Sequence, residues 1–390
     1  MSTEFKHGVS VIEVDSGSRP IRVVSTSVIG LVATADDADD ATFPLNRPVL
    51  LTNLLHGIDK AGSQGTLAPT LHAIYKQANA MTVVVRVASN SDADEQDALV
   101  VGTVSAGRKT GLKALLAAKA ELGVSPKILA APGLDTKAVT TELVSIAQKL
   151  NGFVYAGAPG ESKEEAVRYA GNFGQRELML LYPKFTGFNE VARRDSDIEA
   201  TAVALGLRAR LDNEVGWHKS ISNVVVNGVS GLSIDVDFDF TSAATDAHYL
   251  NSNNITTLVR EQGFRLWGNR TLSSDPKYCF ETYVRTAQVL KETMARAHLW
   301  AIDKPLTPGL ASDIIAGLNG ELRALAKDGY LIGAEAWYDP DRNSKDSLRE
   351  GKLTVKYDFT PVPPLEHLSL HQHLTDTYLI DFARRIEAGG

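Results

Sequence analysis

Residues 49–212 predict an α/β fold, because short apolar runs alternate with stretches that have helical periodicity. Apolar runs such as residues 81–87 are typical of strands buried on both faces of a mainly parallel sheet. After residue 250 the pattern changes to two long amphipathic helices followed by alternating strands. We therefore expect an α/β middle domain followed by a C-terminal α+β domain.

The predicted elements of the first 250 residues follow one another closely. Residues 8–14 and 21–33 are β-rich, and polar residues 89–97 mark a boundary. Residues 234–240 alternate strictly and predict a strand with one buried face. The remaining strands are predicted at 49–52, 81–87, 127–131, 152–157 and 177–182, and the helices at 53–61, 66–79, 111–122, 136–150, 161–172 and 196–212.

The stretch 263–276 carries the most specific pattern in the chain. Residues 264–267 predict a short strand, which Gly268-Asn269 ends with a turn that tolerates positive φ. Asp275 then lies where a helix N-cap belongs, with Pro276 at the first helical position. We expect one continuous helix from there to about residue 300.

A second long helix is predicted at 308–328, because apolar residues recur on one side at helical spacing. These residues are Leu310, Ile314, Leu318, Leu322 and Leu325. Strands follow at 330–338 and 352–360, after which Pro363 and Pro364 end local pairing. Residues 366–374 form one further strand-like segment which, like residues 8–14, has no partner nearby in the sequence.

Composition limits the classes of function. At 390 residues the chain is long enough for two or three folded units. Its net charge of −7, most of it in residues 1–250, argues against a nucleic-acid binder that neutralises phosphates. Cys279 is the only cysteine, which excludes an intrachain disulfide and fits a reducing compartment. The N-terminus lacks the apolar core of a signal peptide and no apolar run could span a bilayer, so we expect a cytoplasmic product.

Residues 102–110 nearly spell a phosphate-binding loop, which supports an alternative function as a cytoplasmic α/β nucleotide-binding enzyme. Arg108 stands where the lysine of such a loop belongs, so that Lys109 and Thr110 are shifted out of register. No clear apolar strand ending in an acidic residue follows to hold the metal. The pattern therefore favours a loop without nucleotide over a nucleotide site.

Two further clusters resemble metal ligands. His371 and His373 would share a strand face near His367, and four aspartates crowd residues 36–40. The histidines have no evident carboxylate partner, and the acidic run lacks the spacing of a calcium loop. A wet strand face and a solvated loop are the favoured interpretations, so no metal or other cofactor is expected.

The sequence G-F-R-L-W-G-N-R-T-L-S-S-D at 263–275 resembles the signature of contractile tail-sheath proteins from temperate myoviruses and R-type bacteriocins (tailocins). The resemblance extends over nearly the whole chain. It includes segments at 6–9, 46–52, 206–209, 216–220, 226–229 and 357–366. A nucleic-acid contact through stacking on Trp267 is conceivable, but the arginines beside it are suited to anchoring carbonyls or acidic groups. The structural residues of the signature are then Arg265, Trp267, Asn269, Arg270 and Asp275.

This resemblance implies a structural protein without catalytic turnover. The family has a subtilisin-like middle domain, but a Ser/His/Asp triad is not expected, since the chain has no Gly-x-Ser-x-Gly elbow and no histidine between His72 and His218. Such proteins stack as hexameric rings around a tail tube and contract to drive it through a bacterial envelope. The implied partners are further copies of the chain, the tail tube protein, and the baseplate and tail terminator proteins, without direct nucleic-acid contact or membrane insertion. Assembly would take place in the cytoplasm of a bacterial host, into a virion tail or a released tailocin.

The resemblance also implies a domain order and contact residues. The expected units are an N-terminal β arm (1–24), an N-terminal α/β segment (25–88), an outer α/β domain (89–250), an inner α+β domain (251–365) and a C-terminal β arm (366–390). The arms would pair with neighbouring subunits through Val9, Val11, Ile12, Val14, Leu368, Leu370 and Leu374. Helix 308–328 would line the lumen and touch the tube through its outward residues Gly320, Arg323 and Lys327.

Overall fold

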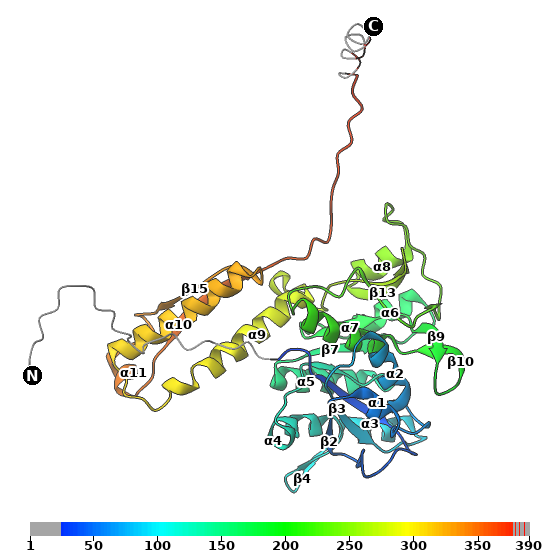
Figure 1. The fold of residues 1–390 in the computed structure, drawn as a ribbon, viewed down its shortest axis with the longest axis horizontal. Coiled ribbons are helices and arrows are strands. Elements are labelled where there is room, and N and C mark those ends of the chain that lie inside the picture. The colour runs from blue at the N-terminus through cyan, green and yellow to red at the C-terminus, as the bar shows by residue number, and fades with distance from the viewer. Residues whose placement is uncertain (1–24, 377–378, 380–381, 383–385, 387–390) are drawn as a thin grey trace, which may run out of the picture.

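The computed structural model describes residues 25–376 together with residues 379, 382 and 386. An α/β body, residues 25–280, carries an elongated C-terminal unit, residues 281–361, that projects from it (Figure 1). Beyond this unit, residues 367–376 form an extended segment that runs away from both parts (Figure 1). Among the described residues, no helix combines the length and the apolar character needed to cross a membrane.

A nine-stranded sheet forms the centre of the α/β body. Its central strands are parallel and the antiparallel strands lie at the two ends. The spatial order is β11 (Val224–Val225), β14 (Phe264–Trp267), β13 (Ile255–Arg260), β8 (Leu178–Leu181), β7 (Phe153–Gly157), β6 (Ile128–Ala130), β1 (Ile29–Thr34), β3 (Thr82–Val87) and β2 (Pro48–Leu51). Ile29 lies opposite Thr82 in β3 and Ile128 in β6. All residues of β1 and β3 are buried, as apolar strands covered on both faces should be.

Helices cover both faces of this sheet and divide its core in two. One core lies under α1 (Leu54–Ile58), α2 (Leu67–Gln77) and α7 (Ala200–Glu214). The other lies under α3 (Ala93–Val101), η1 (Gly111–Ala117), α4 (Ala118–Leu122), α5 (Lys137–Leu150), α6 (Lys163–Ala170) and α8 (Asp246–Ser252). Strand β1 serves both cores, with Ile29 and Leu31 on one side and Val32 on the other.

Smaller elements decorate the body. A three-stranded sheet has the order β10 (Arg194–Ile198), β9 (Phe185–Asn189) and β12 (Gly231–Leu232). A short hairpin joins β4 (Val104–Ser105) to β5 (Arg108–Lys109). The turn η2 (Pro276–Tyr278) leads to the C-terminal unit.

The C-terminal unit consists of helices packed beside a two-stranded antiparallel sheet (Figure 1). Its elements are α9 (Glu281–Ala297), η3 (Leu299–Ala301), α10 (Pro308–Lys327), β15 (Leu331–Tyr338), α11 (Lys345–Arg349) and β16 (Val355–Pro361). Leu318, Leu322 and Leu325 of α10 pack against this sheet and against Leu290 of α9 in a separate core. The central and C-terminal parts of the apolar stripe predicted for helix 308–328 are therefore buried.

Most predicted elements are confirmed to within about three residues at each end, including the alternation of buried strands with helices. Several predictions are wrong. The stretch 89–97 is not a simple boundary, because Asp92 caps helix α3 by accepting from Glu95 N at 2.9 Å. The predicted helix 196–212 begins only at Ala200, since residues 194–198 form the β10 edge of a hairpin with β9. The first part of the predicted helix 111–122 is the 3₁₀ helix η1.

Two further corrections concern the second half of the chain. Residues 234–240 form no strand in this structure; their alternation instead places Phe238 and Phe240 against Trp267. The expected continuous helix from Pro276 is interrupted after one turn, where Thr271 N donates to Cys279 O at 2.8 Å and Glu281 N donates to Asn269 O at 3.1 Å. These bonds hold Phe280 in an extended conformation, with φ −101° and ψ 139°, and α9 starts anew at Glu281.

Strands β13 and β14 also bear on the expected domain division. Both fall within the proposed inner domain, 251–365, yet they hydrogen-bond into the central sheet through β8. The sheet likewise includes β1, β2 and β3 from the proposed segment 25–88. The division into outer and inner domains stays a prediction, but the strands of residues 255–267 belong structurally to the α/β body.

Candidate assembly surfaces

The signature turn, residues 263–275, begins where β14 lies between β13 and β11. Leu266 is buried opposite Leu258 and fixes the strand in the sheet. Gly268 follows with φ +139°, and a Cβ atom there would lie 2.6 Å from Thr256 Oγ1 and 2.7 Å from Thr256 Cα. The turn that ends the strand therefore needs glycine for both conformation and space.

The side chains of Arg265 and Trp267 hold the surroundings of this strand in place. Arg265 donates from Nε to Glu261 O at 2.8 Å and from Nη1 to Asn223 O at 3.1 Å. Trp267 makes edge contacts with Phe238 and Phe240, at centroid distances of 5.1 and 6.1 Å. These contacts within the chain favour the structural interpretation of both residues over base stacking.

The rest of the signature connects the body to the start of the C-terminal unit and to the tail. Asn269 accepts from Glu281 N through its backbone oxygen, and Asp275 caps η2 by accepting from Lys277 N at 2.9 Å. Arg270 makes a two-bond ion pair with Glu366, from Nε to Oε1 at 2.7 Å and from Nη2 to Oε2 at 2.6 Å. The turn thus contacts both the start of α9 and the distant C-terminal tail.

A buried ionic cluster fastens α7 to α9. Arg208 Nη2 lies 2.8 Å from Asp212 Oδ1, and Arg285 Nη1 donates to the same oxygen at 2.9 Å. Glu281 accepts from the Tyr155 hydroxyl and lies 3.4 Å from Arg208 Nη1. All four charged side chains are at most 3% exposed. Such pairs are costly to desolvate and are tolerated only when further hydrogen bonds complete them.

The arginines of this cluster also bind backbone oxygens. Arg208 donates to Lys219 O at 2.6 Å and to Gly216 O at 3.2 Å, which fixes the loop after α7. Burial alone would raise the pKa of the Asp212 carboxyl, but the charges of Arg208 and Arg285 outweigh it and hold this pKa below its usual value. Asp212 is therefore ionised at neutral pH.

Sequence reasoning missed this cluster, although a signal for it existed. Arg208 and Asp212 are four residues apart on one helix, and Glu281 and Arg285 are four residues apart on another. Both pairs lie among apolar residues with helical spacing, which places them on buried faces. Charged i,i+4 pairs on an apolar face are a pattern that a sequence can show.

A stack of aromatic rings forms a second joint between the body and the C-terminal unit. Trp217, which follows α7, stacks on Tyr330 between α10 and β15, with ring centroids 4.5 Å apart and an angle of 21°. The His218 ring meets the same tyrosine edge-on at 4.5 Å. Together with the ionic cluster, these contacts fix the direction in which the C-terminal unit leaves the body.

The sheet of the C-terminal unit leaves its outer edges open. Within the part of the chain that the structure describes, β15 and β16 pair only with each other. Leu368, Leu370 and Leu374 of the proposed C-terminal arm are strongly exposed and form no strand within this chain. The proposed N-terminal arm residues Val9, Val11, Ile12 and Val14 lie outside the described residues.

Helix α10 presents its proposed tube-contact residues to solvent. Gly320, Arg323 and Lys327 are all exposed, on the side away from the buried Leu318 and Leu322. Apart from its two chain neighbours and the adjacent backbone of its own helix, no atom of the described residues lies within 4 Å of a Cβ built on Gly320. The geometry leaves room for a close partner, and the contact with a tube stays a prediction.

Comparison with known proteins decides the family. A family model described as phage tail sheath protein central domain matches residues 107–272, and one described as phage tail sheath C-terminal domain matches residues 273–375. A third, for the domain III N-terminal region of tail sheath protein Gp18, matches residues 26–87. The chain is 48% identical to the tail sheath protein of Escherichia phage P2, over 99% of this chain and 100% of that protein. The chain belongs to the phage tail sheath family.

Other relatives agree with this membership of the sheath family. The major tail sheath protein of Serratia phage KSP20 is 44% identical, over 97% of each chain. Among solved structures, the contracted helical sheath of the anti-feeding prophage has a TM-score of 0.72 at 17% identity, covering 94% of this chain and 99% of that chain. The contracted PVC sheath complex has a TM-score of 0.68 at 16% identity, covering 97% and 100%. These two structures show that the sheath fold is shared.

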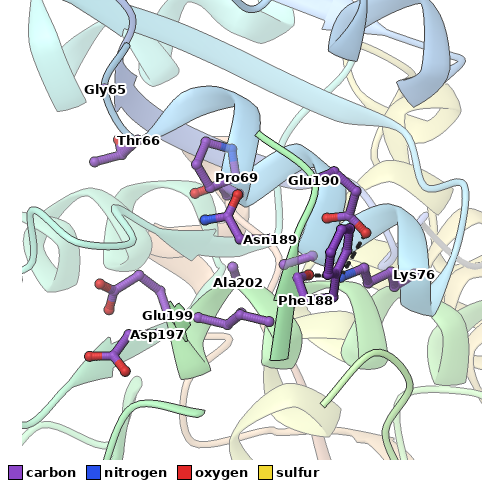
Figure 2. Close-up of a pocket in the computed structure, with 13 residues that line it drawn as sticks. Gly65, Thr66, Pro69, Lys76, Phe188, Asn189, Glu190, Asp197, Glu199 and Ala202 are labelled. Carbon is purple, nitrogen blue, oxygen red and sulfur yellow. Dashed lines mark hydrogen bonds and ion pairs between the residues drawn. The ribbon is translucent and has the colours of Figure 1, made fainter. Parts of the chain in front are cut away.

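The α/β body of this sheath-family chain has cavities of about 180, 340 and 360 Å³. One of about 180 Å³ lies between α2 and the β9–β10 hairpin, where Lys76 and Glu190 form an ion pair of 2.9 Å (Figure 2). Pockets for small molecules usually occupy roughly 300–1,000 Å³. Lys76 also donates to Phe188 O at 2.7 Å, so its charge is already engaged within the protein. This cavity is a gap left where helix α2 packs against the β9–β10 hairpin.

The near match to a phosphate-binding loop is a hairpin in the structure. Residues 104–109 form the β4–β5 turn, with Ala106 and Gly107 at positive φ. Helix α3 precedes this turn and the 3₁₀ helix η1 follows it, whereas a phosphate-binding loop joins a strand to a helix N-terminus. The sequence pattern that suggested a nucleotide-binding enzyme therefore forms a surface hairpin.

The aspartates of the candidate metal cluster at residues 36–40 form hydrogen bonds and an ion pair within the chain. Hydrogen bonds from the backbone N–H groups of Gln64 and Ser63 lower the pKa of the exposed Asp37 carboxyl to about 2, so this residue anchors a neighbouring loop. Asp40 pairs with the buried Arg86. In the described residues, no group of three or more histidine, cysteine, aspartate or glutamate side chains is arranged to hold a metal ion.

Proposed function

We propose that the chain is a structural subunit of a contractile tail sheath, which stacks as hexameric rings around a tail tube and contracts to drive the tube through a bacterial envelope. The observation that carries this proposal is the 48% identity, over essentially the full length, to the tail sheath protein of phage P2. The fold shared with two sheaths described as contracted supports it. Baseplate and tail terminator proteins are its expected partners at the sheath ends, and one structural match comes from a baseplate assembly.

The open sheet edges support the proposed role of the terminal arms. An unpaired strand edge is a ready template for another chain, and main-chain hydrogen bonds across it survive moderate reorientation of the two subunits. Strands β15 and β16 offer two such edges, and residues 366–376 leave their own subunit extended and exposed. We infer that the arms of neighbouring subunits, 1–24 and 366–390, complete this sheet.

The charge distribution supports the proposed radial order. Residues 1–250 hold 29 acidic and 23 basic residues, whereas residues 251–390 hold 18 and 17. Subunits with a nearly neutral surface repel one another little when they pack densely, whereas an acidic surface repels its copies and is better placed facing solvent. We therefore place residues 89–250 outside and helix α10 inside, against the tube. The subtilisin-like topology of the middle domain remains part of this proposal, as do assembly in the host cytoplasm and the choice between virion tail and tailocin.

Electron microscopy of the expressed protein tests the proposed function. Purified full-length chain, concentrated at moderate salt, should form tubes or rings of constant diameter in negative stain. Co-expression with the cognate tail tube protein should shift the population toward extended, tube-filled sheath. Protein that stays monomeric at every concentration and salt tested, with and without the tube protein, would exclude the proposed role.

A further inference from the structure

The ion pair between Arg270 and Glu366 lies at the base of the C-terminal tail, and the sheath fold described above gives it no role. The two residues are 96 positions apart in the sequence. Both carboxylate oxygens are used, at 2.7 and 2.6 Å, which is the fork geometry in which arginine binds a carboxylate most specifically. The two side chains are 40% and 37% exposed, so the pair is accessible from solvent.

Arg270 is held rigidly on the body side of this pair. Its backbone forms an isolated antiparallel bridge with Phe280, and its guanidinium lies 5.4 Å from the centre of the Phe280 ring. The neighbouring Asn269 and Thr271 are bonded through their backbones to Glu281 and Cys279. An arginine fixed on both sides of its Cα loses little further freedom when it binds a carboxylate.

Glu366 is equally well placed on the tail side. It follows the end of β16 by five residues, and two of the intervening residues, Pro363 and Pro364, have φ fixed by their rings. Every residue from 365 to 376 is exposed. The pair thus sits where the chain stops packing on its own subunit and becomes free to meet another.

We propose that the Arg270–Glu366 pair is a positioning clamp that fixes where, and in which direction, the C-terminal arm leaves its subunit. This inference rests on the proposed function, in which the arm pairs with a neighbour. Without the clamp the arm would be anchored at the end of β16, and five extra residues extend its reach by about 17 Å. An arm with a longer and looser base has a lower effective concentration at the correct edge and a higher one at wrong edges.

Charge reversal and its repair test the clamp in the full-length chain. The variants are Arg270→Glu, Glu366→Arg and the double exchange carrying both substitutions. Arg349→Glu is the matched control, since Arg349 forms an exposed ion pair with Asp346 at 2.6 Å within the C-terminal unit. Each protein is measured by thermal unfolding as a dilute monomer and by counting regular tubes in negative-stain micrographs at a fixed concentration.

Each single reversal should leave the unfolding temperature within about 2 °C of the parent, because exposed ion pairs contribute little to folding. The number of regular tubes should fall at least fivefold, and irregular aggregates should replace them. The double exchange should restore at least half of the parent count, and Arg349→Glu should match the parent. A fold-stabilising role alone would lower the unfolding temperature, which distinguishes the two explanations.

Two outcomes would overturn the clamp while leaving the proposed function intact. Single variants that form as many regular tubes as the parent would show that the pair does not position the arm. A double exchange that stays as defective as the single variants would show that the pairing itself is not what matters. If the parent chain forms no tubes, the proposed function fails and the clamp fails with it; the clamp fails alone when the parent assembles and the variants do so equally well.

Discussion

Replacing Asp212 with asparagine tests the buried ionic cluster most directly. Asp212 is fully buried, and it is the carboxylate that lies against both Arg208 and Arg285. Asparagine keeps the shape but leaves two guanidinium charges with only the carboxylate of Glu281 to balance them. Breaking a buried ion pair from one side costs about 3–5 kcal/mol, a large fraction of the roughly 5–15 kcal/mol that stabilises a typical protein. We therefore expect a loss of about 3–5 kcal/mol in unfolding free energy.

Urea unfolding followed by tryptophan fluorescence measures this loss, since Trp217 lies in the joint that the cluster supports. Asp346→Asn is the matched control, because its ion pair with Arg349 has both side chains more than three-quarters exposed and contributes only ~0–1 kcal/mol. The lowered pKa of Asp212 means that its stabilisation is present above the usual value of 3.8 and is lost as the pH falls through the folded-state pKa. The difference between parent and variant should thus be constant from about pH 5 to 8 and shrink only below pH 3.8. An Asp212→Asn protein within 1 kcal/mol of the parent at pH 7 would refute the reasoning.

Three further predictions concern assembly. Deleting residues 1–20 should leave a folded monomer by circular dichroism but abolish ordered sheath; long regular tubes from the truncated protein would contradict the proposed arm. Limited proteolysis of intact sheath should cut loops such as 185–196 before residues 255–370, and the reverse order would count against placing the acidic domain outside. Arg323→Glu with Lys327→Glu should yield protein that assembles mostly as contracted, tube-free sheath, because it reverses two positive charges on the exposed side of α10; equal numbers of extended, tube-filled particles would show that this helix is not the tube contact.

The order of buried strands and helices could be predicted from the sequence. Each parallel strand is a short, continuous apolar run, and exposed segments of this chain lack such runs. Strand β10 could not, since its residues include Asp195 and Asp197 and its partner lies in a hairpin at the periphery. Residues 234–240 misled for the opposite reason. Their alternation reflects Ile234 and Val236 packed against the second core of the body and Phe238 against Trp267, and periodicity alone does not distinguish that arrangement from a strand.

The candidate assembly surfaces could be predicted only in part. The strand, the turn and the capping role of Asp275 follow from local rules of backbone geometry, and the structure contains all three. The pairing of Arg270 with Glu366 depends on how two segments far apart in the sequence meet in the fold, which no local pattern encodes. The proposed partners of the arms belong to other subunits, so a single sequence can indicate only that a strand lacks a local partner.

The central sheet has a consequence for the timing of synthesis. Its strands are drawn from residues 29 to 267, and β13 pairs with β8 across about 75 intervening residues, so the body cannot close until some two-thirds of the chain has been translated. At roughly 5–20 residues per second, the remaining third takes on the order of ten seconds to emerge. The open-edged hairpin β15–β16 and the tail beyond it are made in that interval, after every strand of the body is available. The sheet edges that we propose the arms of other copies complete are thus translated only after every strand of the body, so this contact cannot form before the body can fold.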